Sequence, residues 1–122
     1  MSDQEKIVYT ITHAGEDPDR CSIPFVLANA ALAMDVEAVV VLQSTGVFLA
    51  QKGYADHVHA PGLPPMKELL SNFVELGGRI LVCGPCIKER DISEADFVQG
   101  ASVTAAGALT QELLTANATL VY

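Results

Sequence analysis

Short apolar runs rich in β-branched residues alternate along the chain with longer segments rich in Ala and Leu. The short runs are typical of β-strands and span residues 6–12, 36–42, 79–83 and 118–122, with one more near Ser102. The longer segments place apolar residues at helical spacing and predict helices over 23–34, 66–76 and 104–115. This alternation predicts a mostly parallel sheet of about five strands with helices on both faces. We therefore expect an α/β fold, a three-layer α/β/α sandwich, forming a single domain over residues 1–122.

Prolines and capping residues predict where some elements begin. Asp17 can cap a helix, and Pro18 suits a first helical position. Pro24 lacks an amide hydrogen, which predicts that the first helix begins near this residue or kinks there. Segment 53–65 is rich in Pro and Gly and predicts a long ordered loop.

Composition narrows the function classes. Seven Lys and Arg against fifteen Asp and Glu give a net charge of −8, which disfavours binding to nucleic acid. No apolar run approaches the ~20 residues of a membrane span, and the polar, acidic start is unlike a signal peptide. We therefore expect a cytoplasmic protein, in which thiols stay reduced. The three cysteines, an odd number, also argue against a disulfide framework.

The segment 83–86, Cys-Gly-Pro-Cys, directly follows an apolar strand. In α/β proteins ligands bind at the carboxyl ends of strands, so Cys83 is the leading candidate for a catalytic thiol. Its position before a helix predicts a lowered pKa, and Gly84 allows a sharp turn that exposes amide groups to an anionic sulfur. The alternative is a cysteine that merely packs in the core.

Cys86 lies one helical turn beyond Cys83 and is either an auxiliary catalytic thiol or a helix residue facing the core. The match to a thioredoxin motif is weak, because here the motif follows two-thirds of the chain and no suitable proline comes after Pro85. Cys21, near the start of the first helix, is either a further thiol at the same edge or an exposed or half-buried bystander.

Other polar residues are placed near the same edge of the sheet. His13 follows the first strand, where it can hydrogen-bond a thiolate or form an ordinary loop contact. Ser44 begins a short helical segment and offers hydroxyl and backbone donors to an anion. His57 and His59 with Cys83 and Cys86 form a possible but poorly supported zinc set, so we expect no metal and no cofactor.

The order of these segments resembles the DsrE/DsrF family of small sulfur-relay proteins. The resemblance is carried by Ile-Thr-His at 11–13 with Glu-Asp-Pro at 16–18, Leu-Ala-Asn-Ala-Ala-Leu-Ala at 27–33, Ser-Thr-Gly-Val at 44–47, Leu-Val-Cys-Gly-Pro-Cys at 81–86 with Arg90 and Ile92, and Gly-Ala-Ser-Val at 100–103. It implies a three-layer α/β/α fold and homo-oligomers, often trimers. It also implies that Cys83 accepts sulfane sulfur as a persulfide and passes it to a partner protein.

The sequence thus favours a cytoplasmic sulfur carrier or sulfurtransferase. Its catalytic candidates are Cys83 and Cys86, and its binding candidates are His13, Gly84 and Ser44. Its partners are expected to be sulfur donor and acceptor proteins or small thiols. The loop 53–65 and the Ala-rich helices are expected to provide surface for self-association. Two alternatives remain: a non-catalytic oligomeric binding protein of the same fold, and a metal or thiol-redox site at the two cysteines.

Overall fold

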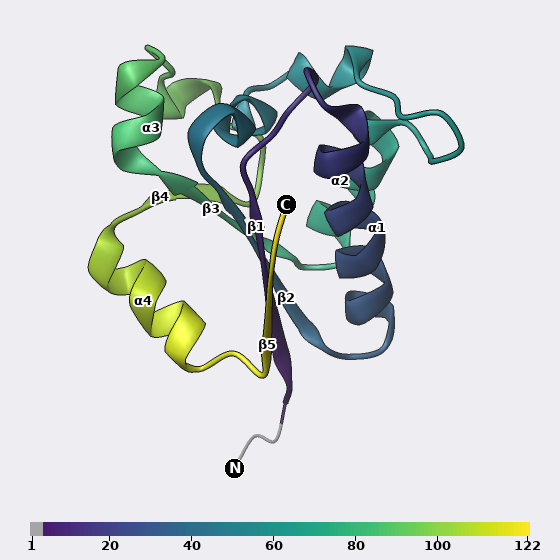
Figure 1. The fold of residues 1–122 in the computed structure, drawn as a ribbon, viewed down its shortest axis with the longest axis vertical. Helices are drawn as coiled ribbons and strands as arrows, with labels where there is room; N and C mark the ends of the chain where they lie inside the picture. The colour runs from purple at the N-terminus through teal and green to yellow at the C-terminus, as the bar shows by residue number, and fades with distance from the viewer. Residues whose placement is uncertain (1–3) are drawn as a thin grey trace.

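The computed structural model describes residues 4–122, and its centre is a sheet of five parallel strands in the order β4-β3-β2-β1-β5 (Figure 1). The strands are β1 (Lys6–Ile11), β2 (Glu37–Leu42), β3 (Arg79–Cys83), β4 (Ala101–Thr104) and β5 (Ala118–Val121). They match the five apolar runs of the sequence. The chain winds from β1 outwards to β4 and then returns to place β5 on the other side of β1.

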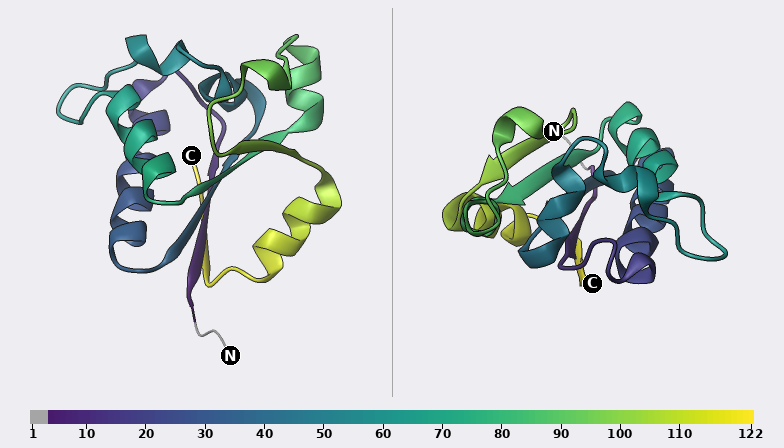
Figure 2. Two further views of the ribbon diagram at one scale, coloured as in Figure 1. Left: turned by 180° about the vertical axis from the view of Figure 1, so that it is seen from behind. Right: turned by 90° about the horizontal axis from the view of Figure 1, so that it is seen from above.

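Helices cover both faces of this sheet, as the sequence predicts (Figures 1 and 2). The helical segments are α1 (Pro18–Ala33), α2 (Met66–Glu75), α3 (Gly84–Glu89) and α4 (Ala106–Leu114), with short 3₁₀ turns η1 (Ser44–Ala50), η2 (Tyr54–His57) and η3 (Glu94–Asp96). Helices α1 and α2 pack together on one face, and α4 lies on the other. The fold is therefore a three-layer α/β/α sandwich. Among residues 4–122, no helix is long and apolar enough to cross a membrane.

The two faces of the sheet are covered unequally. The face toward α1 and α2 carries a large core in which Tyr9, Phe25 and Phe73 are almost fully buried. The apolar cluster on the opposite face is built on three buried valines, Val8, Val39 and Val41, with α4 contributing the partly buried Leu109. None of the nine residues of α4 is fully buried. The third layer is therefore thin.

Helix α1 begins earlier than Pro24 suggested. The Asp17 carboxylate accepts a hydrogen bond from the Arg20 amide, and Pro18 occupies the first turn, so the cap starts the helix there. Pro24 lies buried inside the helix. The expectation that the helix begins near Pro24 was wrong, because this cap and the burial of neighbours such as Phe25 outweigh one lost backbone hydrogen bond.

The carboxyl ends of β1, β2 and β3 lie in the upper half of Figure 1, where η1 packs against β2 and β3. Gly46 in η1 lies so close to β1 that an added Cβ would be 2.2 Å from the Ile11 carbonyl oxygen. Only glycine fits such an approach. This contact fixes the start of η1 directly over the strand ends.

Candidate functional site

Two free thiols lie side by side at this edge. Cys83 ends β3, and Cys86 is the third residue of α3, so the turn between them folds one sulfur back onto the other. Their Sγ atoms are 2.6 Å apart, and both residues are partly exposed. The structure thus brings together the two catalytic candidates of the sequence and leaves both open to solvent.

Gly84 connects the strand to the helix in a confined space. A Cβ at this position would lie 3.3 Å from Val103 Cγ1 and 3.6 Å from the Thr104 carbonyl oxygen. A side chain here would press on the end of β4. In the structure Gly84 therefore allows α3 to start close against the sheet, next to Cys83.

Ser44 contacts the cysteine pair through its backbone amide. Its amide nitrogen donates a hydrogen bond to Cys86 Sγ at 3.2 Å. Ser44 has a φ of 52°, in the left-handed region that residues other than glycine rarely adopt. Residues in such conformations cluster at functional sites. The donor expected from Ser44 is present, and its sulfur partner is Cys86.

Burial raises the pKa of the Cys83 thiol, and the adjacent Cys86 thiol raises it further. The Cys86 backbone amide and the positive charge of Arg90 act in the opposite direction but do not outweigh them. The expected lowering of the Cys83 pKa was therefore wrong. The sequence position before a helix could not show that the sulfur would lie partly buried beside a second thiol.

Arg90 brings a positively charged side chain next to the two cysteines. Its guanidinium Nη1 donates a hydrogen bond to the Cys86 carbonyl oxygen at 3.2 Å, which holds the side chain beside the cysteine turn. Its charge favours the thiolate form of Cys83. An arginine so placed can also stabilise an anionic persulfide.

His13 lies at the same edge of the sheet but is directed to another partner. Its Nδ1 is 2.7 Å from Glu16 Oε2, and the other oxygen of this carboxylate accepts the Ala14 amide at 2.6 Å. Among the described residues, no hydrogen bond joins His13 to either sulfur. The structure therefore places His13 in the loop after β1, where its partner is Glu16.

Cys21 is not part of the site. Its side chain is 0% exposed in the core between α1 and the sheet, so it is neither an edge thiol nor an exposed bystander. Burial raises the pKa of its thiol to about 11, which leaves it protonated and unreactive at neutral pH.

A zinc set of histidines and cysteines is not assembled. Within residues 4–122, no three His, Cys, Asp or Glu side chains come together as possible metal ligands. His57 ends η2, and His59 Nε2 lies 2.7 Å from the Leu63 carbonyl oxygen in its own loop. The zinc alternative therefore has no support in the geometry.

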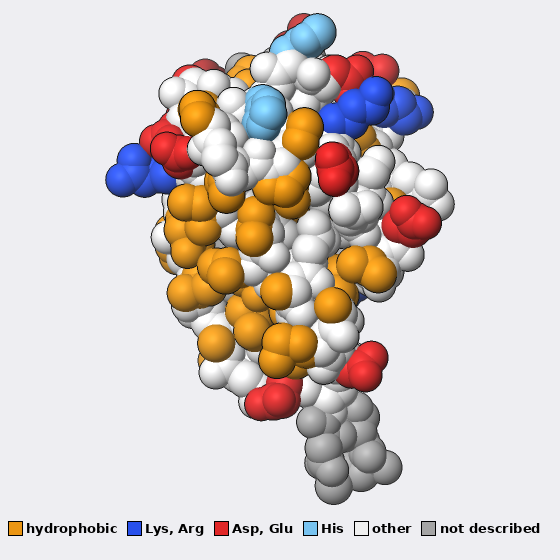
Figure 3. Space-filling model, turned by 90° about the vertical axis from the view of Figure 1, so that its right-hand side faces the viewer, with side chains coloured by type: hydrophobic (Ala, Val, Ile, Leu, Met, Phe, Trp, Pro, Cys, Tyr) orange, Lys and Arg blue, Asp and Glu red, His pale blue; other side chains and the backbone are white. Residues whose placement is uncertain are grey.

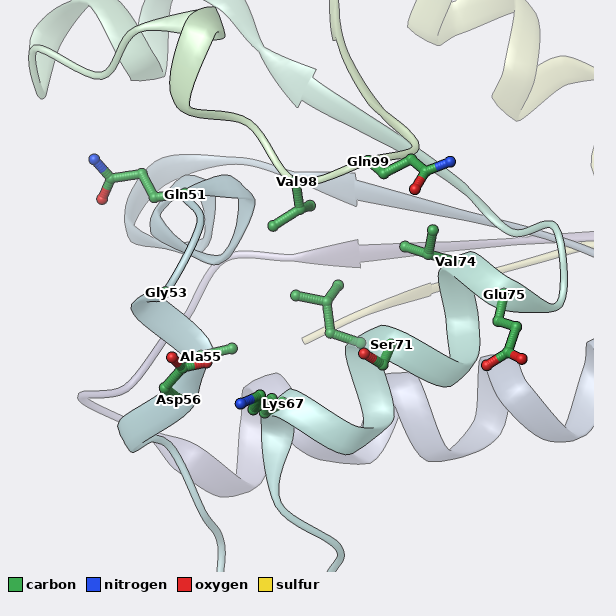
Figure 4. Close-up of a pocket in the computed structure, with 11 residues that line it drawn as sticks. Gln51, Gly53, Ala55, Asp56, Lys67, Ser71, Val74, Glu75, Val98 and Gln99 are labelled. Carbon is green, nitrogen blue, oxygen red and sulfur yellow. The ribbon is translucent and has the colours of Figure 1, made fainter.

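An open cavity of about 600 Å³ lies at the other end of η1, between α2 and the segment that contains Val98 (Figure 4). Lys67 and Asp56 stand at one end of this cavity and Glu75 at the other. Neither Cys83 nor Cys86 lines it. Gln51, which lines the cavity, directly follows η1, and Ser44 at the start of η1 contacts Cys86.

These features define a class: a small three-layer α/β/α protein with two free, partly exposed thiols at the carboxyl end of an inner parallel strand. The family model of the DsrE/DsrF-like family matches residues 5–122, and the chain belongs to this family. The earlier resemblance is thus confirmed.

Related proteins extend the match but carry no assigned activity. The uncharacterized protein MJ0989 of Methanocaldococcus jannaschii is 34% identical over 98 residues, which are 80% of this chain and 82% of that protein. The uncharacterized protein MK0008 of Methanopyrus kandleri is 34% identical over 94 residues, 77% of this chain and 74% of its own length.

Two solved structures show the same fold. The YchN protein of E. coli aligns with a TM-score of 0.79 at 18% identity, covering 98% of this chain and 99% of its own. The protein of unknown function MTH1491 from Methanobacterium thermoautotrophicum aligns with a TM-score of 0.77 at 16% identity, covering 98% of this chain and all of its own. At such identities the likeness concerns the fold alone.

Proposed function

We propose that this protein carries sulfane sulfur as a persulfide on Cys83 and passes it to a partner, which is a protein or a small thiol. The observation that supports this most is the partly exposed Cys83 thiol at the carboxyl end of β3, with Arg90 beside it. Family membership supports the same class of activity. We place this activity in the cytoplasm, where thiols are kept reduced.

Loading and unloading are two thiol exchange steps. In loading, the Cys83 thiolate attacks the outer sulfur of a donor persulfide, a bond forms between Cys83 Sγ and that sulfur, and the donor leaves as a thiolate. In unloading, an acceptor thiolate attacks the same outer sulfur, and Cys83 leaves. Arg90 favours the anionic forms of Cys83 in both steps. Because the Cys83 pKa is raised, loading should become faster as pH rises.

The loading test uses intact-protein mass spectrometry after incubation with glutathione persulfide. We expect the Cys86→Ser protein to gain one sulfur atom and the Cys83→Ser/Cys86→Ser protein to gain none. A Cys21→Ala/Cys86→Ser protein is the matched control and should load like Cys86→Ser, because the Cys21 sulfur is buried and protonated. Loading that persists without Cys83, or no loading in Cys86→Ser, would overturn the proposal.

We also propose that the chain works as a homo-oligomer, a trimer by family resemblance, and that the outer face of α1 is the contact surface. Between Arg20 and Asp35 the sequence has no charged residue. Ile23, Leu27 and Met34 expose 37%, 40% and 73% of their surface on this helix. Figure 3 looks onto the side of α1 and α2 and shows apolar side chains across its middle, with charged ones around its rim.

An exposed helix face that carries apolar side chains and no charge is normally covered, so this face of α1 suits a second copy of the chain. The Ala-rich helix thus fits the expectation for self-association. The loop 53–65 does not, because among the described residues it contributes no large exposed apolar side chain.

A further inference from the structure

A sulfur carrier of the proposed kind needs one thiol, yet the site holds two in contact. Cys86 Sγ lies 2.6 Å from Cys83 Sγ, which is the sulfur that would become the inner atom of the persulfide. Any sulfur held on Cys83 is therefore loaded beside a second nucleophile. This second thiol decides what happens to the carried sulfur when no acceptor is present.

The surroundings of Cys86 hold its sulfur against Cys83. The Ser44 amide donates a hydrogen bond to Cys86 Sγ at 3.2 Å. The left-handed backbone of Ser44 and the close approach of Gly46 to Ile11 fix this amide in place. Cys83, which carries the outer sulfur, is also partly exposed, so a small leaving group can escape to solvent.

We propose that Cys86 resolves the Cys83 persulfide within the same chain, releasing the carried sulfur as sulfide and leaving a Cys83–Cys86 disulfide. The inference rests on the proposed persulfide at Cys83. It adds a second product, sulfide, to the transfer described above.

The step balances without an outside oxidant. The Cys86 thiolate attacks Cys83 Sγ, and a bond forms between the two Sγ atoms. The bond from Cys83 Sγ to the outer sulfur breaks, and the electron pair leaves with that sulfur as hydrosulfide, which keeps its proton. The sulfane sulfur is thereby reduced by two electrons, and the two cysteines are oxidised to a disulfide. A dithiol reductant then returns the pair to its thiol form.

Resolution and transfer compete for one intermediate. An acceptor thiol attacks the outer sulfur of the persulfide, whereas Cys86 attacks the inner one. An acceptor bound at the site removes the sulfur before Cys86 reacts, and without an acceptor the chain releases sulfide and stays oxidised. The pair thus works as a redox switch that stops further loading until a dithiol reductant is available.

The experiment treats fully reduced, full-length protein with one equivalent of glutathione persulfide and then removes small molecules. Sulfide is measured in the filtrate, and the protein is alkylated and weighed by mass spectrometry. We expect the wild type to release about one sulfide per chain and to lose two hydrogen atoms, with Cys83 and Cys86 both protected from alkylation. The Cys86→Ser and Cys86→Ala proteins should instead keep one extra sulfur atom and release only background sulfide. Cys21→Ala should behave like the wild type.

The outcomes separate this inference from the function on which it rests. A wild-type protein that keeps the extra sulfur while Cys86 remains open to alkylation would overturn the inference and leave the carrier function standing. If the Cys86 variants gain no sulfur, or gain a whole glutathione instead, the carrier function itself fails. Circular dichroism of the Cys86→Ser and Cys86→Ala proteins is the check that both are folded. If the two variants keep sulfur and release sulfide to the same extent, the serine hydroxyl has no effect.

Discussion

At the scale of single residues, backbone conformation sets where the hydrogen-bond donor to Cys86 lies. Ser44 reaches Cys86 through its amide, and its hydroxyl takes no part in that contact. The amide is in place because Ser44 takes a left-handed conformation and because Gly46, two residues on, lets η1 lie against the end of β1. The geometry around the sulfurs therefore depends on a glycine that touches neither of them.

Replacing Gly46 tests this dependence. An added Cβ in Gly46→Ala would overlap the Ile11 carbonyl, a backbone atom that cannot turn aside, so we expect unfolding free energy to fall by about 2–4 kcal/mol. The shift of η1 should also loosen the Ser44 amide from Cys86. Urea unfolding followed by circular dichroism measures the first effect.

Gly107 supplies the control for that substitution. It lies in α4 with open space where a Cβ would be, so Gly107→Ala should be neutral or stabilise by about 0.5–1 kcal/mol. Equal effects of the two substitutions would show that the contact between Gly46 and Ile11 has no special role.

At the scale of elements, α4 is held to the sheet by a cluster of charges as well as by the partly buried Leu109. None of its residues is fully buried, but Glu112 contacts two cations from the strands. Its carboxylate lies 2.9 Å from Lys6 Nζ and 2.8 Å from Arg79 Nη1, and Arg79 also reaches Glu37 at 2.8 Å. This cluster ties α4 to three strands.

The cluster makes the docking of α4 sensitive to acid. Hydrogen bonds from Arg79 and, less strongly, from Lys6 lower the pKa of Glu112 from 4.5 to about 2 despite some burial. Because the folded pKa lies below the unfolded one, the stabilisation is complete above about pH 4.5 and is lost as pH falls towards about 2. Allowing for screening by solvent, we expect a contribution of ~1–2 kcal/mol.

Glu112→Gln should therefore lower the unfolding free energy at neutral pH, and the difference from wild type should shrink as pH falls through this range. Urea unfolding at a series of pH values measures it. Glu5→Gln, at an exposed glutamate outside the cluster, is the control and should show little difference at any pH. If the difference in unfolding free energy between Glu112→Gln and wild type does not change with pH, the ionised Glu112 carboxylate is not the source of this stabilisation.

The strands were predictable because their apolar, β-branched runs leave few other choices, as in β2, which is buried along most of its length. Asp17 and Pro18 marked the observed start of α1, whereas the expectation of a start near Pro24 failed because its buried neighbours override a local rule. The Cys83 pKa was missed because no local pattern reports that a second sulfur lies in contact. Likewise, nothing marks Ser44 for a left-handed backbone, because a serine there is ordinary in sequence. Sequence thus locates the cysteine site, whereas its electrostatics come from contacts between elements.

At the scale of the whole molecule, apolar surface remains at one edge of the sheet and on one helical layer. Strand β5 is an edge strand without charged residues, and Val121 exposes 73% of its surface. Uncovered apolar edges favour association with other chains. The outer face of α1 adds a second such surface.

Leu27→Glu tests the α1 face as the contact between copies. Leu27 is 40% exposed in the single chain, so a glutamate there leaves the monomer folded, but it would bring an unpaired carboxylate into an apolar contact. We expect the dissociation constant of the oligomer to rise about 100-fold or more, which corresponds to about 3 kcal/mol. Sedimentation velocity over a range of concentrations measures the change.

Gln99→Glu adds the same charge at an exposed position away from α1 and should leave association unchanged. If Leu27→Glu associates as tightly as wild type, the contact lies elsewhere, and the β5 edge becomes the next surface to substitute. A wild type that sediments only as a monomer would instead contradict self-association altogether, and the sulfur site would then have to function within one chain.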